Sequence, residues 1–223
     1  MIVAAVPVKD LANAKQRLVP ALEPGRRIEL ARAMLRDVLR ALAGARFDQI
    51  WVVTRDEEVE QLAGVFGVEV LHEEANRGHT TAVGLAQREA SRRGADVFVT
   101  IPGDVPCVSA DDIAVLATIA RERKPTAIFA PSRSHRGTNG VALAPPDVMP
   151  LTFGEPSFAN HLTTARARHL VPVVVERSGL GLDVDGPDDL RALLASGAHT
   201  ESGRLVASWR IDLRMVIPAA AGE

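Results

Sequence analysis

Residues 97–106 have the sequence VFVTIPGDVP, the segment most informative about the architecture of this chain. Residues 97–101 are almost continuously apolar, which is typical of a strand buried on both faces of a parallel sheet. An acidic residue, Asp104, follows this strand directly, flanked by a glycine and prolines. Since such a sheet is covered by helices on both sides, we expect helical segments before and after this strand.

Short β-branched runs and longer segments with helical spacing alternate on both sides of it. Before it, strands are predicted for residues 2–6, 50–53 and 68–71, and helices for residues 26–43, 57–64 and 79–93. After it, helices are predicted for residues 110–121, for residues 157–168 and from Pro187 onward. Strands are predicted there for residues 127–130, 141–143, 171–175 and 182–185, and a loop for residues 132–140. This alternation predicts an α/β fold with a mostly parallel sheet and helices on both faces.

The chain is expected to form one domain over residues 1–223, because we find no repeat and no low-complexity segment. The pattern is less regular from about His199 onward. Residues 205–217 could form an edge strand there, and such an edge would permit a homodimer.

Composition and charge exclude several classes of protein. The 223 residues carry 26 Lys+Arg against 28 Asp+Glu, without a basic stripe, so a nucleic-acid partner is not expected. A single cysteine, Cys107, cannot form an internal disulfide or a paired-cysteine zinc site. The chain shows neither a signal-peptide pattern nor the roughly 18 apolar residues needed to span a bilayer. We therefore expect a soluble, cytoplasmic protein without a membrane partner.

Polar segments follow several predicted strands, and ligands of open parallel sheets bind outside the carboxyl ends of the strands. We therefore expect these segments to converge on one crevice. The first, residues 7–18, has the sequence PVKDLANAKQRL and carries Lys9, Lys15 and Arg17. These cations are suited to hold a polyphosphate, and a solvated basic loop is the alternative. The glycine patterns of classical dinucleotide and P-loop sites are absent.

Three aspartates are candidate magnesium ligands. Asp104 follows the strand over residues 97–101, and Asp183 and Asp185 lie in the sequence GLDVDGP, residues 181–187. Alternation along a strand would place Asp183 and Asp185 on one face, where two carboxylates repel unless a cation, an amide or a proton intervenes. Mg²⁺ prefers one or two carboxylates with phosphate oxygens and water. The alternative for Asp185 is that it caps the following helix, whereas Ser109 is the better cap for the helix after Asp104.

Three further segments are weaker candidates. RGTNG, residues 136–140, and FGEPS, residues 153–157, could bring backbone amides and a helix-start hydroxyl to an anion, although plain turns have the same pattern. NRGHTT, residues 76–81, opens a helix and could either cap it or bind a purine edge. The remaining histidines show no metal-ligand spacing and are interpreted as surface or packing residues: His72, His135, His161, His169 and His199.

Taken together, the order VPVKDLANAKQRL, PGDVP, RGTNG, FGEPS and DVDGPDDL resembles the guanylyltransferases of deazaflavin coenzyme F-420 biosynthesis. This is the family of 2-phospho-L-lactate and phosphoenolpyruvate guanylyltransferases, and the similarity covers roughly residues 1–195. The resemblance implies a Rossmann-like nucleotidyltransferase fold of the GT-A type, GTP as the nucleotide donor and a reaction that depends on Mg²⁺.

The resemblance also implies roles for individual residues. Asp104 and Asp185 would bind the metal with Asp183 nearby, and Asp104, Lys15 and Arg17 would act in catalysis. Nucleotide contacts would come from Pro7, Val8, Lys9, Lys15, Arg17, Gly78 and Thr80, and acceptor contacts from Thr138, Gly154 and Ser157. The chain departs from the family at Gly78-His79-Thr80, where glycine, leucine and asparagine are common, and at Gly186, where threonine is usual.

The expected reaction transfers GMP from GTP to 2-phospho-L-lactate, phosphoenolpyruvate or 3-phospho-D-glycerate and releases pyrophosphate. A downstream transferase of the same pathway would then use the product. Two alternatives remain from the sequence. One is a GT-A nucleotidyltransferase that uses CTP or UTP on a sugar or polyol phosphate, and the other is a catalytically silent nucleotide-binding protein.

Overall fold

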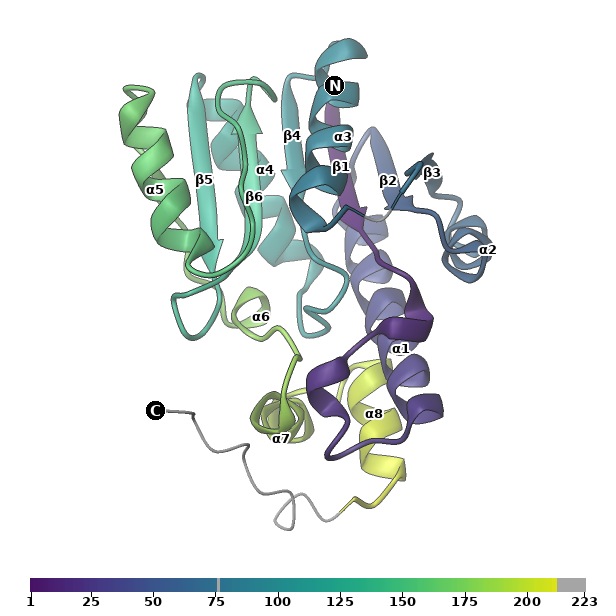
Figure 1. Ribbon diagram of the computed structural model, residues 1–223. Coiled ribbons are helices and arrows are strands. Elements are labelled where there is room, and N and C mark those ends of the chain that lie inside the picture. Colours follow the sequence, from purple (N-terminus) through teal and green to yellow (C-terminus); the bar gives the residue numbers. More distant parts are fainter. Residues whose placement is uncertain (76, 212–223) are drawn as a thin grey trace.

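The computed structural model describes residues 1–75 and 77–211 (Figure 1). Over these residues seven strands form one sheet in the order β3-β2-β1-β4-β6-β5-β7. The strands are β1 (Ile2–Pro7), β2 (Gln49–Thr54), β3 (Glu69–His72), β4 (Val97–Thr100), β5 (Thr126–Pro131), β6 (Thr138–Ala144) and β7 (Val173–Val174). All pairs are parallel except those of β6, which runs antiparallel to β4 and β5. The predicted α/β fold with a mostly parallel sheet is confirmed.

The strand order reverses between β1 and β4. The chain runs from β1 outward to β2 and β3, and then returns to β4 on the other side of β1. The loops that leave β1 and β4 therefore diverge, and a crevice forms between them at the carboxyl ends of these strands. The segments after β1 and β4 are residues 8–18 and 101–109, which contain the predicted phosphate loop and Asp104.

Helices cover both faces of this sheet, as Figure 1 shows. They are α1 (Pro24–Gly44), α2 (Glu57–Val65), α3 (His79–Arg92), α4 (Ala110–Glu122), α5 (Ser157–Ala167), α6 (Ser178–Gly181), α7 (Pro187–Ser196) and α8 (Glu201–Ser208). Alternate residues of β1 point to opposite faces: Ala4 and Val6 pack with α1, α2 and α4, whereas Val3 and Ala5 pack with α3 and α5. Burial on both faces explains why the strands are so apolar. No helix among the described residues has the length and apolar character that crossing a membrane requires.

A third apolar cluster lies beyond the carboxyl ends of the strands, where α7 and α8 pack on α1 (Figure 1). The buried carboxylate of Asp37 in α1 fixes α8, because it accepts hydrogen bonds from the backbone N–H groups of Glu201 and Ser202, at 2.8 and 2.9 Å, and from the Ser202 hydroxyl at 2.8 Å. The loop after β1 joins this cluster through the buried side chain of Leu18.

Three predicted elements were wrong, and two of them concern the site. Residues 138–140, predicted as part of a loop, begin β6, where a Cβ added to Gly140 would lie 3.0 Å from Leu116 Cδ1. Residues 182–185, predicted as a strand, form no strand, and the Val184 N–H instead donates to the Asp104 carbonyl at 3.1 Å. The predicted edge strand over residues 205–217 is wrong for residues 205–208, which belong to α8.

The other differences are smaller. The strand predicted over residues 171–175 shortens to β7, Val173–Val174. Residues 212–217 of the predicted edge strand lie outside the described residues. Ser109 caps α4 as predicted, in a capping box with Asp112. Asp185 does not cap α7, since the Asp189 carboxylate accepts from the Gly186 N–H at 2.9 Å instead.

Candidate functional site

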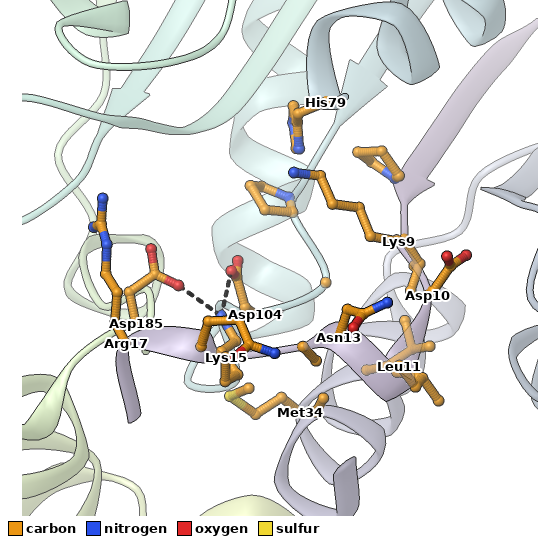
Figure 2. Close-up of a pocket in the computed structure, with 18 residues that line it drawn as sticks. Lys9, Asp10, Leu11, Asn13, Lys15, Arg17, Met34, His79, Asp104 and Asp185 are labelled. Atoms are coloured by element: carbon orange, nitrogen blue, oxygen red, sulfur yellow. Dashed lines mark hydrogen bonds and ion pairs between the residues drawn. The ribbon is translucent and has the colours of Figure 1, made fainter. Parts of the chain in front are cut away.

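A cavity of about 390 Å³ opens at the carboxyl ends of β1 and β4 (Figure 2). Its walls come from the loop after β1, the loop after β4, one face of α1 and the start of α3. Seven residues predicted to act in binding or catalysis line it: Pro7, Val8, Lys9, Lys15, Arg17, Asp104 and Asp185. The expected convergence of the segments after β1 and β4 is therefore found, and Asp185 reaches the same cavity.

The loop after β1 has a defined shape that places its cations at the cavity. Two short 3-10 helices, Leu11–Asn13 and Gln16–Leu18, are separated by a turn in which Lys15 has φ 54° and ψ 45°. This left-handed conformation is costly for a non-glycine residue and persists where the surroundings hold it. The Asp56 carboxylate anchors the loop by accepting a hydrogen bond from the Leu11 N–H at 2.7 Å.

Lys15 joins two carboxylates that lie 89 and 170 residues away in the chain. Its Nζ atom is 2.6 Å from Asp104 Oδ2 and 2.8 Å from Asp185 Oδ1, the two interactions drawn as dashed lines in Figure 2. The Lys15 side chain is 9% exposed, whereas those of Asp104 and Asp185 are 30% and 45% exposed. The carboxylates are thus open on the cavity side while the ammonium group is enclosed.

The charges of this cluster stabilise one another. Burial disfavours the charged form of Lys15, but Asp104 and Asp185 outweigh it and raise the pKa of Lys15 above its usual value. Burial would raise the pKa of Asp104, yet the Lys15 charge holds that pKa below its usual range. Both groups are therefore ionised at neutral pH, as Coulomb attraction between close opposite charges requires.

The pair Asp104 and Asp185 has the chemistry of a divalent-cation site. Two carboxylate oxygens from separate segments converge on one positive group, and Mg²⁺ in nucleotide sites commonly takes one or two carboxylates and completes its shell with phosphate oxygens and water. Among residues 1–75 and 77–211 no three His, Cys, Asp or Glu side chains group as metal ligands. The residues present therefore fit a cation whose remaining ligands come from a bound phosphate.

Asp183, the third predicted metal residue, lies beside this pair but does not line the cavity. Its Oδ1 accepts a hydrogen bond at 3.1 Å from Asn139 Nδ2, which also donates to the Leu180 carbonyl at 2.8 Å. Burial raises the pKa of Asp183, and the nearby charges of Asp104 and Asp185 act in the same direction. An amide group, that of Asn139, is therefore the hydrogen-bond partner of the Asp183 carboxylate, and an amide was one of the three partners considered for this pair of aspartates from the sequence.

The predicted acceptor residues form a separate group that does not line the cavity. Thr138 and Ser157 are buried, and the Ser157 hydroxyl donates to Thr138 Oγ1 at 3.3 Å. His161 Nε2 accepts from the Thr152 N–H at 3.1 Å, so its ring proton is on Nδ1 and is donated to Thr138 Oγ1 at 3.0 Å. Thr138 thus accepts twice and keeps its own hydroxyl proton for another partner. Gly154, with φ 107°, is exposed at the turn before Ser157.

Gly78 and Thr80, predicted to contact the nucleotide, lie at the start of α3 but do not line the cavity. Between them, His79 does line it, and this residue was not among the predicted site residues. Thr80 has a structural contact, since its Oγ1 accepts from the Phe153 N–H at 2.8 Å. In the sequence, the only indication for His79 is its position between two candidate residues. No local sequence pattern distinguishes a histidine that faces a cavity from a histidine on the surface.

Comparison with known proteins places this arrangement among nucleotidyltransferases. Residues 2–220 match the family model described as Guanylyl transferase CofC like. The chain is 38% identical over 194 residues to the phosphoenolpyruvate guanylyltransferase of Rubrobacter xylanophilus, which covers 87% of this chain and 94% of that protein. It is 33% identical over 211 residues to the 2-phospho-L-lactate guanylyltransferase of Methanothermobacter thermautotrophicus, covering 95% of this chain and 92% of that protein.

The fold is also found in solved structures. The crystal structure of a proposed nucleotide-diphospho-sugar transferase from Desulfovibrio desulfuricans G20 superposes with a TM-score of 0.76. The match covers 93% of this chain and 94% of that chain at 15% sequence identity. At this identity the likeness concerns the fold, and it agrees with the Rossmann-like nucleotidyltransferase architecture expected from the sequence.

Proposed function

This chain belongs to the CofC-like guanylyl transferase family and is a nucleotidyltransferase, and we propose that it transfers GMP from GTP to a small phosphorylated three-carbon acid. The names of its relatives make phosphoenolpyruvate and 2-phospho-L-lactate the first acceptors to test, with 3-phospho-D-glycerate as the third. The product would serve coenzyme F-420 biosynthesis. The observation that carries the proposal is the convergence of Asp104 and Asp185 on Lys15 in a cavity bordered by Lys9 and Arg17.

In this reaction an oxygen of the acceptor phosphate attacks the α-phosphorus of GTP. The new P–O bond forms as the bond from the α-phosphorus to the oxygen bridging the β-phosphorus breaks, and pyrophosphate leaves with that electron pair. An ionised phosphate is already nucleophilic, so the chain needs no strong general base. The chain must instead hold two polyanions together, since two unit charges about 4 Å apart repel by roughly 4 kcal/mol at an effective dielectric near 20.

Cationic side chains reduce this repulsion. Lys9, Lys15 and Arg17 come from one loop and border one cavity, so they can contact successive phosphates of a single triphosphate. A magnesium ion held by Asp104 and Asp185 would neutralise phosphate charge and polarise the phosphoryl group under attack. Lys15 is kept charged by the same two carboxylates, and a metal ion that replaces it there would leave its ammonium group to donate to a phosphate oxygen.

The acceptor is proposed to lie near Thr138, Gly154 and Ser157. Thr138 supports this role because its two accepted hydrogen bonds, from His161 and Ser157, leave its hydroxyl proton to be donated. Gly154 has a positive φ, which favours glycine, and its backbone without a side chain lies close in sequence to the start of α5, where N–H groups favour an anion. The three candidate acids differ by a double bond, a methyl group or a hydroxyl position, so acceptor choice is a matter for experiment.

The decisive experiment incubates the protein with Mg²⁺, each of GTP, ATP, CTP and UTP, and each of the three acids in turn. Pyrophosphate release is measured, and the adduct is identified by mass after conversion by a downstream transferase that consumes it. We expect release only with GTP and with one acid preferred. A strong preference for CTP or UTP would refute the proposal in favour of a sugar- or polyol-phosphate nucleotidyltransferase, and GTP binding without release with any acid would indicate a silent nucleotide-binding protein.

A pair of variants tests the role of Asp104. Asp104→Asn keeps the shape of the side chain but removes its charge, so pyrophosphate release should fall by about 100-fold or more if the carboxylate holds the metal. Asp111→Asn, on the exposed first turn of α4, is the matched control and should retain full activity. Near-normal turnover by Asp104→Asn would show that this carboxylate is not needed for catalysis.

A further inference from the structure

Arg27, near the start of α1, is a buried charged residue without an acidic partner. The residue is 7% exposed, and its Nη1 atom donates a hydrogen bond to Gln16 Oε1 at 3.1 Å. Its Nε atom is shielded from solvent without a hydrogen-bond partner, and no carboxylate in residues 1–75 and 77–211 forms an ion pair with it. Buried charges are normally paired, because burying a charge without a counter-charge is costly. The fold therefore retains a positive charge that it does not itself balance.

This charge lies behind the loop that borders the cavity. Arg27 precedes Ala31 by four residues, so the two side chains lie on one face of α1, and Ala31 lines the cavity. The hydrogen-bond partner of Arg27, Gln16, also lines the cavity and stands between Lys15 and Arg17 in the sequence. Charges act over several ångströms where water is partly excluded. The charge of Arg27 can therefore act on an anion in the cavity without touching it.

The side chains that line the cavity have no excess of positive charge. Three cationic groups and three carboxylates are among them: Lys9, Lys15, Arg17, Asp10, Asp104 and Asp185 (Figure 2). The ring of His79 adds no charge at neutral pH, because burial lowers its pKa to about 4. A cleft attracts a polyanion when the charges around it give a positive potential. Arg27 supplies such an excess directly behind the lining.

We propose that Arg27 strengthens binding of the nucleotide's polyphosphate by its charge, as a positioning residue that acts from behind Gln16 without touching the ligand. This inference rests on the proposed function, since the polyphosphate is that of GTP bound in the cavity. The phosphates would provide the counter-charge that Arg27 lacks in the free protein, which favours the bound state. The sequence did not indicate Arg27, because an arginine within an amphipathic helix is ordinarily exposed.

The test compares Arg27→Met, which removes the charge, with Arg27→Lys, which keeps it. Arg26→Met is the matched control, because Arg26 is the exposed neighbour in α1 and its guanidinium carbon lies 5.5 Å from the centroid of the Trp209 ring. Dissociation constants are measured by calorimetry with Mg²⁺ for GTP and for inorganic tripolyphosphate. Thermal melts without ligand measure the stability of each variant.

We expect Arg27→Met to weaken the binding of GTP and of tripolyphosphate by about tenfold each. Arg27→Lys should bind both ligands nearly as the wild type does, and Arg26→Met should equal the wild type. Without ligand, Arg27→Met should melt at or above the temperature of the wild type, since an unpaired buried charge is removed and water can replace the lost bond to the exposed Gln16. A residue with a purely structural role would instead lower the melting temperature when replaced.

Unchanged tripolyphosphate binding by Arg27→Met would overturn the inference. A loss that Arg27→Lys does not restore, or a loss together with a lower melting temperature, would also overturn it, because either result assigns Arg27 a structural role. An equal loss in Arg26→Met would assign the effect to the net charge of the protein. A wild type that binds tripolyphosphate but not GTP would refute the proposed function, and the tripolyphosphate comparison would still decide the role of Arg27.

Discussion

Replacing Lys15 by methionine tests whether Asp104 and Asp185 form a cation site. The change keeps a long apolar stem but removes the ammonium group, which is 2.6 and 2.8 Å from the two carboxylates. At such separations each pair of unit charges attracts by roughly 6 kcal/mol at an effective dielectric near 20, although desolvation offsets much of this. The variant leaves two carboxylates facing each other with no counter-charge between them.

The expected cost follows from the burial of the partners. Removing one member of a fully buried ion pair costs about 3–5 kcal/mol, because the remaining charge is unpaired. Asp185 is 45% exposed and Asp104 30% exposed, so water will compensate part of that charge. We therefore expect Lys15→Met to lower the free energy of unfolding by about 2–3 kcal/mol in the presence of EDTA. Lys124→Met is the matched control, since the 2.8 Å ion pair of Lys124 with Asp96 is exposed to solvent and should contribute far less to stability.

The assay is urea unfolding of both variants and the wild type, with EDTA and with increasing Mn²⁺. Without the ammonium group, Mn²⁺ no longer competes with Lys15 for the carboxylates and should stabilise Lys15→Met more than the wild type. An ion present at 100 times its dissociation constant adds about 2.7 kcal/mol. If Lys15→Met is as stable as Lys124→Met, the cluster contributes little to the fold. If it is unstable but unaffected by Mn²⁺, the two carboxylates do not form a cation site.

Three further predictions concern the scaffold around the cavity. Asp37→Ala removes the acceptor of three hydrogen bonds from the start of α8 and should lower the free energy of unfolding by about 2–3 kcal/mol, measured in urea, with exposed Asp111→Ala as the control. Gly203→Ala should lower the free energy of unfolding by about 2 kcal/mol or more in the same assay, since the new Cβ would lie 2.0 Å from the Gly197 carbonyl oxygen. An unfolding midpoint equal to that of the wild type would contradict the close packing of α8 on the turn after α7. Burial lowers the pKa of His161 to about 4, below the value of about 6.5 in an unfolded chain, so the unfolded state binds more protons as pH falls from 6.5 to 4. The contribution of neutral His161 to the free energy of unfolding is complete above pH 6.5, and about 3 kcal/mol of it is lost by pH 4. His161→Phe should therefore flatten the curve of stability against pH between these values. An unchanged slope would show that His161 is not buried in the neutral form.

The elements around the cavity were predictable because their signals are local. The continuous apolar run of residues 97–101 indicates β4, and the apolar positions at helical spacing in residues 26–43 indicate α1. Ser109 and Asp112 mark the start of α4 within four residues of sequence. The errors occurred where a local pattern fits two structures. Residues 182–185 alternate as a strand does, yet they pair with the loop at Asp104 instead of with a sheet edge.

The candidate residues themselves were also visible in the sequence, since an acidic or basic side chain after a strand is a local feature. Asp104, Asp185, Lys9, Lys15 and Arg17 all lie in one cavity, although their chemical roles stay predictions. Thr138 and Ser157 were named as well, but their joint burial with His161 was not, because it depends on the packing of α5 against β6.

Composition, periodicity and motif order were sufficient to specify an α/β sheet, its family resemblance and the charged groups at its edge, because each depends on residues close together in the chain. Which of those groups meet depends on strand order, a property of the assembled sheet. The reversal of strand order between β1 and β4 brings Lys15 into contact with Asp104 and Asp185, which are 89 and 170 residues away in the chain. Asp183 instead accepts a hydrogen bond from Asn139. The same assembly turns His79 into the cavity, since no short stretch of sequence encodes which side of a helix start will be enclosed by a loop from elsewhere in the chain.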